Sequence, residues 1–576
     1  MSGSMVSGSV PVALLLALFT ACAGGRQGRD PAAAPDQAKG ECAGGRNSTA
    51  LAEVSPAALE AHMRFLAADS LRGRGTGTPD YDLAARYVEA CYAKFGLEPA
   101  GTREYMQLVP LRRARAVEGS SLVIDGAAER RELLRGRDYL PVPDLLRKDV
   151  EVSAPMVLAG FGVTAAEHEY DDYKNIDVRG KIVVLLSGAP RSFPPTARAH
   201  YATMRMKYAN AVRHGAVGIL GVRTRDQTFP WDRAVRQAQA GTMGWLDRRG
   251  EPGEAFPALR GVARLSDSGA ALLFQGGPQS REEILDAAEK GAPPAFELPA
   301  RATIRTVSTH EPLQSPNVAG LLRGSDPRLR DEVVVYTAHL DHLGVGEPVQ
   351  GDSIYNGALD NASGTAALLE VARVFAAVSP APRRSILFLI VTAEEHGLLG
   401  SDYFAEHPTV PLGKIVANLN MDGLAILYPL QQLVPMGAEH STLDAAVTRA
   451  ASQMKIGLAP DPFPEEVFFV RSDQYSFVRR GIPSLFLFMG LQSDSGVDAA
   501  AIFREWGRTR YHTPQDDLGQ PMDLSAGARH AQLNLLVGLE IASADERPAW
   551  KPGDFFGRMF GGSRAPDRSS AGTQQR

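Results

Sequence analysis

Three short apolar runs, each followed closely by acids or histidines, constrain the fold of this chain more than any other feature. They are residues 333–336, 386–391 and 415–417, and they are rich in valine, isoleucine and leucine. Runs of this length and composition are typical of buried strands in a largely parallel sheet. Because open α/β sheets place ligands outside the carboxyl ends of their strands, the polar residues after the three runs are expected to meet at one edge.

These polar residues are the groups that a hydrolytic two-metal site uses. Such a site holds borderline cations with imidazole and carboxylate ligands, includes one bridging anion, and keeps a free base near the reacting water. Loop 357–364 adds another acid, and the distant loop 510–514 adds another histidine. The pattern predicts a two-metal hydrolase built from His339, Asp341, Asp360, Glu394, Glu395, Asp422 and His512.

The alternative reading of these acids is an ordinary solvated surface. Glu394 and Glu395 follow a six-residue apolar strand, where burial without a cation would be costly, so the metal reading is favoured. His342 and His396 adjoin the motifs and are expected to serve local roles. Asp473 is expected either to shape the pocket or to occupy a turn.

Length and composition set broad bounds. A chain of 576 residues is too long for one core and predicts two or more domains. Its net charge of −5, without a basic run, argues against a nucleic-acid partner. Only three cysteines occur, so the chain is not a disulfide scaffold. Cys91 lies on an apolar helical stripe and is expected to be a small core residue, with a bridge to Cys42 as the less favoured alternative.

The N-terminus has the pattern of a targeting segment. Residues 10–21 are a short apolar run, too short to span a bilayer, and they end at Cys22 in a sequence that resembles a bacterial lipobox. We therefore expect a signal peptide over residues 1–22 and a flexible tether over residues 23–47. The protein is expected to be exported to the periplasm or cell surface as a lipoprotein, anchored to a membrane through Cys22.

Local signals predict several further elements. Ser55 and Pro56 indicate a helix start, with the helix running to about residue 68. Residues 79–95 form an apolar helical stripe that Gly96 ends. Residues 467–470 and 483–489 are strand-like, and a disordered tail is expected over residues 549–576.

Five ordered motifs carry a resemblance to a known family. They are His-Leu-Asp-His-Leu-Gly from 339, Asp-Asn-Ala-Ser-Gly from 360, Ala-Glu-Glu from 393, Asn-Leu-Asn-Met-Asp from 418 and Tyr-His-Thr-Pro from 511. In this order they resemble the M28 family of zinc aminopeptidases, which also holds some carboxypeptidases. The resemblance implies an α/β fold with a mixed, mostly parallel central sheet flanked by helices, formed by residues 48–115 and 304–548.

The segment between these two parts resembles a different module. The strand after Val178-Arg179-Gly180-Lys181 and the helix exit at residues 214–218 are similar to the protease-associated domain, a small β-rich insertion found in several exopeptidases. We assign residues 116–303 to this insertion. We expect this insertion to border the entrance of the active site or to select substrates.

The M28 resemblance also implies roles for individual residues. Asp360 would bridge two Zn²⁺ ions, one held by Glu395 and His512 and the other by His339 and Asp422. Glu394 would be the general base. It would take a proton from the water molecule that becomes the metal-bridging hydroxide, and it would pass this proton to the leaving amine. Asp341 would hydrogen-bond the second ring nitrogen of His339, and Tyr511 would donate to the oxyanion.

The leading prediction is thus an exported dizinc aminopeptidase that removes N-terminal residues from peptides. A carboxypeptidase of the same fold is the nearest alternative. A single-zinc glutaminyl cyclase-like enzyme and a non-catalytic binding protein are further alternatives. Metal content distinguishes the last two from a two-zinc hydrolase.

Overall fold

The computed structural model describes residues 53–126, 129–227, 230–464, 466–492 and 496–563. The predicted signal peptide, the tether, Cys22 and Cys42 lie outside these residues, as does the end of the predicted tail. Among the described residues, no helix combines the length and the apolar character needed to cross a membrane.

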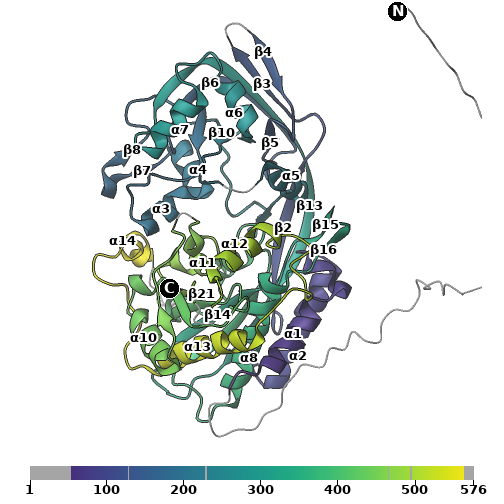
Figure 1. The fold of residues 1–576 in the computed structure, drawn as a ribbon, viewed down its shortest axis with the longest axis vertical. Helices are drawn as coiled ribbons and strands as arrows, with labels where there is room; N and C mark the ends of the chain where they lie inside the picture. Colours follow the sequence, from purple (N-terminus) through teal and green to yellow (C-terminus); the bar gives the residue numbers. More distant parts are fainter. Residues whose placement is uncertain (1–52, 127–128, 228–229, 465, 493–495, 564–576) are drawn as a thin grey trace, which may run out of the picture. The chain divides into compact units, whose positions relative to one another are not determined.

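A mixed central sheet forms the middle of the peptidase-like part (Figure 1). Four neighbouring strands run parallel in the order β17, β14, β18 and β21, and antiparallel neighbours flank them on both sides. The predicted apolar runs form three of the four. The strands are β1 (Glu98–Pro99), β2 (Met106–Ala116), β11 (Thr242–Trp245), β13 (Ala295–Leu322), β14 (Val333–His339), β17 (Ser385–Val391), β18 (Ile415–Asn420), β19 (Gln432–Met436), β20 (Gly457–Leu458) and β21 (Ser484–Met489).

Helices cover both faces of this sheet. Alternate residues of each strand point to opposite sides, so both faces carry apolar side chains that helices bury. Val334 and Tyr336 pack with the larger helical layer, whereas Val333 and Val335 pack with the smaller one. The larger layer comprises α1 (Pro56–Leu66), α2 (Pro79–Phe95), α8 (Gly364–Ala377), α10 (Leu443–Met454) and α13 (Leu524–Ser543), and the smaller layer comprises α9 (Leu399–Glu406) and α11 (Gln474–Val478). The predicted fold class, a mixed α/β sheet flanked by helices, is confirmed.

The first two helices begin and end where the sequence signals place them. The Ser55 hydroxyl accepts a hydrogen bond from the Ala58 amide at the start of α1. Thr78 caps α2 in the same way, and Gly96 ends it with a φ of 76°, a conformation that favours glycine. Capping is a local interaction, which is why a single sequence predicts it well.

Strand β13 links the central sheet to a second group of strands. Its second half pairs with β2 and β17, while its first half pairs with strands from residues 121–159. The sequence predicts a strand only over residues 317–322, the apolar end of these 28 residues. Before residue 309, the remainder alternates exposed or half-buried residues with buried ones, which include Leu298, Ala302 and Ile304.

Residues 121–304 bury their own apolar clusters, apart from those of the central sheet. Their strands are β3 (Ser121–Gly126), β4 (Arg130–Leu133), β5 (Tyr139–Pro141), β6 (Asp149–Ala159), β7 (Thr164–Ala165), β8 (Tyr170–Asp171), β9 (Ile182–Leu186), β10 (Gly218–Val222) and β12 (Val262–Leu265). Their helices are α3 (Pro195–Ala202), α4 (Met204–Arg213), α5 (Trp231–Ala240), α6 (Asp267–Phe274) and α7 (Arg281–Glu289). The assignment of residues 116–303 to a protease-associated domain stays a prediction.

Three local expectations are corrected. Residues 468–470 form one helical turn instead of a strand, since Val467 has a φ of 53° that ends any extended run. Residues 555–560 form helix α14 (Phe555–Phe560), and Phe556 is fully buried against Tyr475 and Trp550, so the expected disorder does not begin at 549. Cys91 is buried as expected but is disulfide-bonded.

Candidate metal centre

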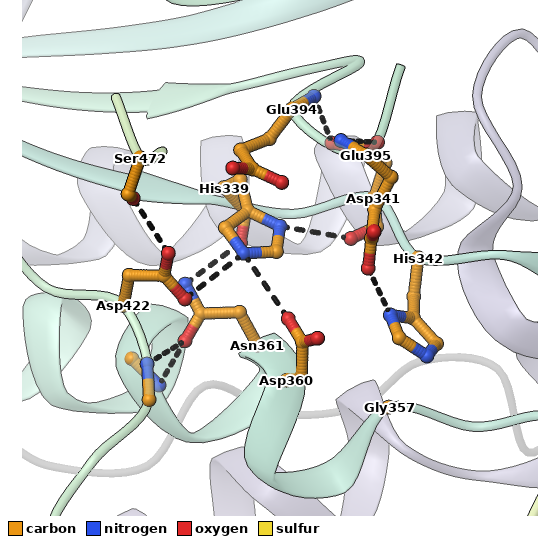
Figure 2. Close-up of polar contacts among 12 residues, drawn as sticks. His339, Asp341, His342, Gly357, Asp360, Asn361, Glu394, Glu395, Asp422 and Ser472 are labelled. Carbon is orange, nitrogen blue, oxygen red and sulfur yellow. Dashed lines mark hydrogen bonds and ion pairs between the residues drawn. The ribbon is translucent and has the colours of Figure 1, made fainter. Parts of the chain in front are cut away.

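The carboxyl ends of three parallel strands bring the predicted acids and histidines together (Figure 2). His339 ends β14, the Glu394–Glu395 pair follows β17, and Asp422 follows β18. The parallel register aligns His339 with Val391, the last residue of the neighbouring strand. Convergence at one sheet edge is therefore a direct consequence of strand direction and register.

Asp360 lies between two histidines and faces each with a different oxygen. Its Oδ1 is 3.3 Å from His339 Nε2, and its Oδ2 is 3.1 Å from His512 Nε2. Each histidine also meets a second carboxylate: His339 Nε2 is 3.2 Å from Asp422 Oδ1, and His512 Nε2 is 3.0 Å from Glu395 Oε2. The result is two imidazole–carboxylate groups that share one carboxylate.

The loop before α8 holds Asp360 by its main chain. The buried carboxylate of Asp516 accepts the amide hydrogens of Leu359 and Asp360, at 2.9 and 3.0 Å. Gly357 precedes this turn with a φ of 59°, and a Cβ there would lie 2.1 Å from Asp360 O and 2.5 Å from the His342 ring. Only glycine fits at this position.

Glu394 and Glu395 are adjacent but have opposite electrostatic surroundings. The backbone turns at Ala393, whose φ is 55°, so the two side chains need not follow strand alternation. Burial raises the pKa of Glu394 well above its usual value. For Glu395 burial acts in the same direction, but His512 and His342 together outweigh it and lower the pKa below the usual range. Acids separated in this way can take different roles, one ionised ligand and one proton carrier.

The histidines respond to the same carboxylates. Burial would lower the pKa of His512, but Glu395 and Asp360 raise it to about 9. The pKa of His339 is likewise raised, because Asp422 and Glu394 outweigh burial. Both shifts report a site with a strong preference for positive charge.

Asp341 acts differently from the sequence-based expectation. His339 Nδ1 lies 3.1 Å from the main-chain oxygen of Asp341, so the predicted contact with the carboxylate is replaced by one with the backbone. The carboxylate instead accepts the Glu394 amide hydrogen at 3.1 Å and the Thr76 hydroxyl at 3.1 Å. Burial raises the pKa of Asp341 to about 6. Asp341 thus positions the glutamate pair through its side chain and His339 through its main chain.

Three residues near the centre were not predicted as part of it. The Ser472 hydroxyl donates to Asp422 Oδ2 at 2.5 Å, and His342 Nδ1 lies 2.6 Å from Glu395 Oε1. The buried guanidinium of Arg74 donates to the main-chain oxygens of Leu340, Asn356 and Gly357. Arg74 belongs to a glycine-rich segment at residues 73–78. The composition of this segment predicts a turn, but it does not predict that Arg74 supports the loops at 340 and 356–357.

Tyr511 lines the cavity beside the centre. Its ring packs against that of His512 in a tilted arrangement, with a centroid distance of 3.9 Å. The cavity has a volume of about 490 Å³ and is also bordered by Asp360, Glu394 and Asp422. Most of its wall is aromatic or otherwise apolar, contributed by Phe463, Phe468, Phe486, Phe488, Met489, Phe503 and Trp506.

The donor set suits divalent cations that accept nitrogen and oxygen ligands. His339, Asp360 and Asp422 present ligand atoms within 4.8 Å of one another, and so do His342, Asp360 and Glu395. Glu395 Oε1 meets His342 Nδ1 at 2.6 Å, whereas His342 Nε2 is buried without a hydrogen-bond partner among the described residues. A buried polar atom without a partner is costly, and coordination to a cation would satisfy it. Imidazole with carboxylate is a donor set typical of zinc.

Part of the chain matches the model of a known protein family. Residues 317–537 match the model of Peptidase family M28. The M28-matching segment contains the whole predicted ligand set. The aminopeptidase NAALADL1 of Mus musculus is 28% identical over 326 residues, which cover 49% of this chain and 40% of the relative. A probable leucine aminopeptidase 2 of Aspergillus oryzae is 28% identical over 217 residues, covering 35% of this chain and 40% of that protein.

The chain thus spans about 40% of the length of these two relatives. Among solved structures, an aminopeptidase from Aneurinibacillus sp. strain AM-1 is similar over 87% of this chain and 95% of its own, with 19% identity and a TM-score of 0.50. This likeness extends the fold comparison beyond the M28-matching segment to most of the chain.

Proposed function

We propose that the chain is a dizinc aminopeptidase. The observation that carries the proposal is the position of Asp360, whose two oxygens face His339 and His512, each beside its own second carboxylate. One zinc would be held by His339, Asp360 and Asp422, and the other by Asp360, Glu395 and His512. Bound zinc would supply Lewis-acid polarisation and favour deprotonation of water near neutral pH.

The chain's own residues supply the proton transfers. Glu394 is partly buried and lines the cavity, and its raised pKa suits a group that accepts a proton from water and later donates it to the leaving amine. Tyr511 lines the same cavity and would donate a hydrogen bond to the oxyanion of the tetrahedral intermediate. The aromatic walls exclude water and favour a large apolar side chain beside the scissile bond.

One observation favours the carboxypeptidase alternative. Four arginines, Arg233, Arg471, Arg504 and Arg508, line the cavity together with the acids. Guanidinium groups bind carboxylates well, so they suit a substrate's free C-terminus. The acids Glu394, Asp422 and Glu466 line the same cavity and suit a free α-amine, which is why we place the aminopeptidase first.

A substrate panel separates these activities. Leucyl and phenylalanyl anilides with a free amine should be cleaved by the zinc-loaded protein, and their N-acetyl counterparts should not. N-blocked peptides with a free C-terminus test the carboxypeptidase, and peptides that begin with glutamine test cyclisation. Metal analysis should find about two zinc ions per chain; one ion with cyclisation, or none with no turnover, would replace the proposal by the corresponding alternative.

Export and membrane anchoring through Cys22 are part of the same proposal. The disulfide at Cys91 supports an oxidising compartment, since such bonds are rare where thiols are kept reduced. Fractionation of cells that express the wild type and Cys22→Ser tests this. The wild type should partition with membranes and incorporate labelled palmitate, and the variant should do neither.

A further inference from the structure

Helix α5 belongs to the predicted insertion but reaches the metal centre. Its first residue, Trp231, donates its indole N–H to Gly136 O at 2.7 Å, which ties the helix to the insertion. None of the residues of α5 is buried in an apolar core. Its side chains at 233 and 237, one turn apart and on one face, contact the segment that carries Tyr511 and His512.

Arg233 holds Tyr511 in two ways. Its Nη2 donates to the main-chain oxygen of Tyr511 at 2.7 Å, and its guanidinium lies 5.0 Å from the centre of the Tyr511 ring. The same ring lies against His512, at a centroid distance of 3.9 Å, and against Trp506, at 5.5 Å. Arg233, Tyr511 and His512 are therefore in consecutive contact, and this series runs from the predicted insertion to the proposed zinc ligand.

Gln237 contacts the far side of the same histidine. Its side-chain amide lies 3.4 Å from His512 Nδ1, while His512 Nε2 faces Asp360 and Glu395. A histidine that binds metal through Nε2 carries its proton on Nδ1 and needs an acceptor there. An amide has both a donor and an acceptor end, so a half-turn of the Gln237 amide presents Oε1 to that proton.

We propose that α5 is a working part of the metal centre, with Arg233 and Gln237 as positioning residues for Tyr511 and His512. This inference rests on the proposed function. The predicted insertion would then do more than border the cavity, because the orientation of one proposed zinc ligand and of the proposed oxyanion donor would depend on helix α5. Arg233 acts on the tyrosine and therefore on turnover, whereas Gln237 acts on the histidine and therefore on metal affinity.

Matched pairs on the same helix test the two roles. Arg233→Ala is compared with Arg236→Ala, and Gln237→Ala with Gln239→Ala, so each pair removes the same group from the same helix. Zinc affinity is measured by competition with a chromophoric chelator, and Co²⁺ replacing zinc reports ligand geometry through its visible spectrum. Steady-state kcat and KM are measured with leucyl anilide, and circular dichroism verifies folding.

Gln237→Ala should weaken zinc binding at one site about 10-fold and change the cobalt spectrum, as expected when the partner of a ligating histidine is lost. Gln237→Glu should restore the affinity, because its carboxylate accepts the Nδ1 proton. Arg233→Ala should lower kcat about 10-fold with both zinc ions retained, and Arg233→Lys should recover little, since lysine lacks the planar group that stacks. Arg236→Ala and Gln239→Ala should stay within two-fold of wild type.

Equal zinc affinity and spectra in Gln237→Ala and Gln239→Ala, or equal kcat in Arg233→Ala and Arg236→Ala, would overturn the corresponding role while leaving the proposed function intact. A wild-type protein that neither binds zinc nor cleaves any substrate would instead overturn the proposed function, and this inference with it.

Discussion

Asp516 accepts the main-chain N–H of Asp360 at 3.0 Å, although 156 residues separate them. The second oxygen of the same carboxylate accepts the Leu359 amide hydrogen, so the side chain fixes two successive peptide units of the bridging loop. Asp516 is fully buried, and burial raises its pKa. The orientation of the Asp360 carboxylate is therefore set by an acid outside the proposed ligand set.

Asp516→Asn should weaken zinc binding by roughly 10-fold, because an amide has one acceptor oxygen for two main-chain donors. The measurement is chelator competition on the purified protein. Asp517→Asn is the control, since the Asp517 side chain accepts a local turn hydrogen bond from the Gly519 amide, and its contact with Gln520 is through the main-chain oxygen. Equal affinities of the two variants would show that the loop keeps Asp360 in place without Asp516.

Glu394→Gln and Asp360→Ala should separate catalysis from metal binding. Glu394→Gln removes the proton carrier but no ligand, so it should retain about two zinc ions and lose roughly 10²–10⁴-fold in kcat. Asp360→Ala removes the shared carboxylate and should lose zinc as well as activity. Metal analysis beside steady-state kinetics measures both effects. Equal zinc loss in the two variants would mean that Glu394 is a ligand.

His512 and His342 both contact Glu395, at 3.0 and 2.6 Å, and only one is proposed as a zinc ligand. His512 also faces Asp360, so His512→Ala should bind one zinc ion fewer than wild type. His342→Ala should keep both ions, with about 10-fold weaker affinity at one site, because it orients Glu395. Titration of the chelated protein with zinc counts the sites. The reverse result would assign the ligand role to His342.

The convergence of the proposed ligands is partly predictable from sequence because some of its signals are local. Apolar strands predict where the chain runs parallel, and the residue types at strand ends predict the chemistry that meets there. His339, Glu395 and Asp422 converge on this basis, whereas Asp360 and His512 lie on loops that only their motifs indicate. The alternating half of β13 and the aromatic residues of α14 were missed for a related reason: their burial depends on partners distant in sequence.

The residues that support the proposed ligands from other parts of the chain are not indicated by any local sequence pattern. Asp516, Arg74 and Gln237 act across 156, 266 and 275 residues, and each lies in a segment whose own composition indicates only a turn or a helix. Their roles follow from tertiary packing, which one sequence does not display. The contact that Asp341 makes with His339 was misassigned for the same reason, since choosing between main-chain and side-chain oxygen requires coordinates.

Phe503 tests the proposed preference for apolar side chains. It lies on α12 (Ala499–Thr509) in the cavity wall, with its ring 5.4 Å from that of Phe463 and 5.6 Å from that of Phe488. Phe503→Ala should lower kcat/KM for phenylalanyl anilide by about 10-fold or more, since buried apolar contact of this size contributes about 1–3 kcal/mol. Alanyl anilide should be affected less. Phe503→Leu is the control and should retain most of the activity; an equal loss on both substrates would place the specificity pocket elsewhere.

His440 and Asp554 connect the C-terminal helix to the rest of the protein, and their pairing predicts a pH dependence of stability. His440 Nδ1 lies 2.6 Å from Asp554 Oδ2, and its Nε2 lies 3.2 Å from Glu439 Oε1. Burial opposes protonation, but the two acids raise the pKa of His440 to about 9. The pKa of Asp554 is lowered, because His440 outweighs burial.

The pKa shifts of His440 and Asp554 determine how the stability of the protein changes with pH. A raised histidine pKa means that the folded protein binds the proton more tightly, so this contribution is complete below about pH 6.5 and is lost as the pH rises toward 9. It amounts to about 3 kcal/mol at most, which corresponds to a pKa raised from 6.5 to about 9. The contribution of Asp554 is lost in the opposite direction, as the pH falls below its ordinary value near 3.8.

A double-mutant cycle measures this coupling. His440→Gln should lower the melting temperature clearly at pH 6 and much less at pH 9.5. Asp554→Asn should act in the same way, and asparagine still caps α14, where Asp554 accepts the Gly557 amide hydrogen. The double variant should be little worse than either single one, since each single change already breaks the pair. If His440→Gln were equally destabilising at both pH values, packing of the ring against Phe556 would account for its effect instead of charge.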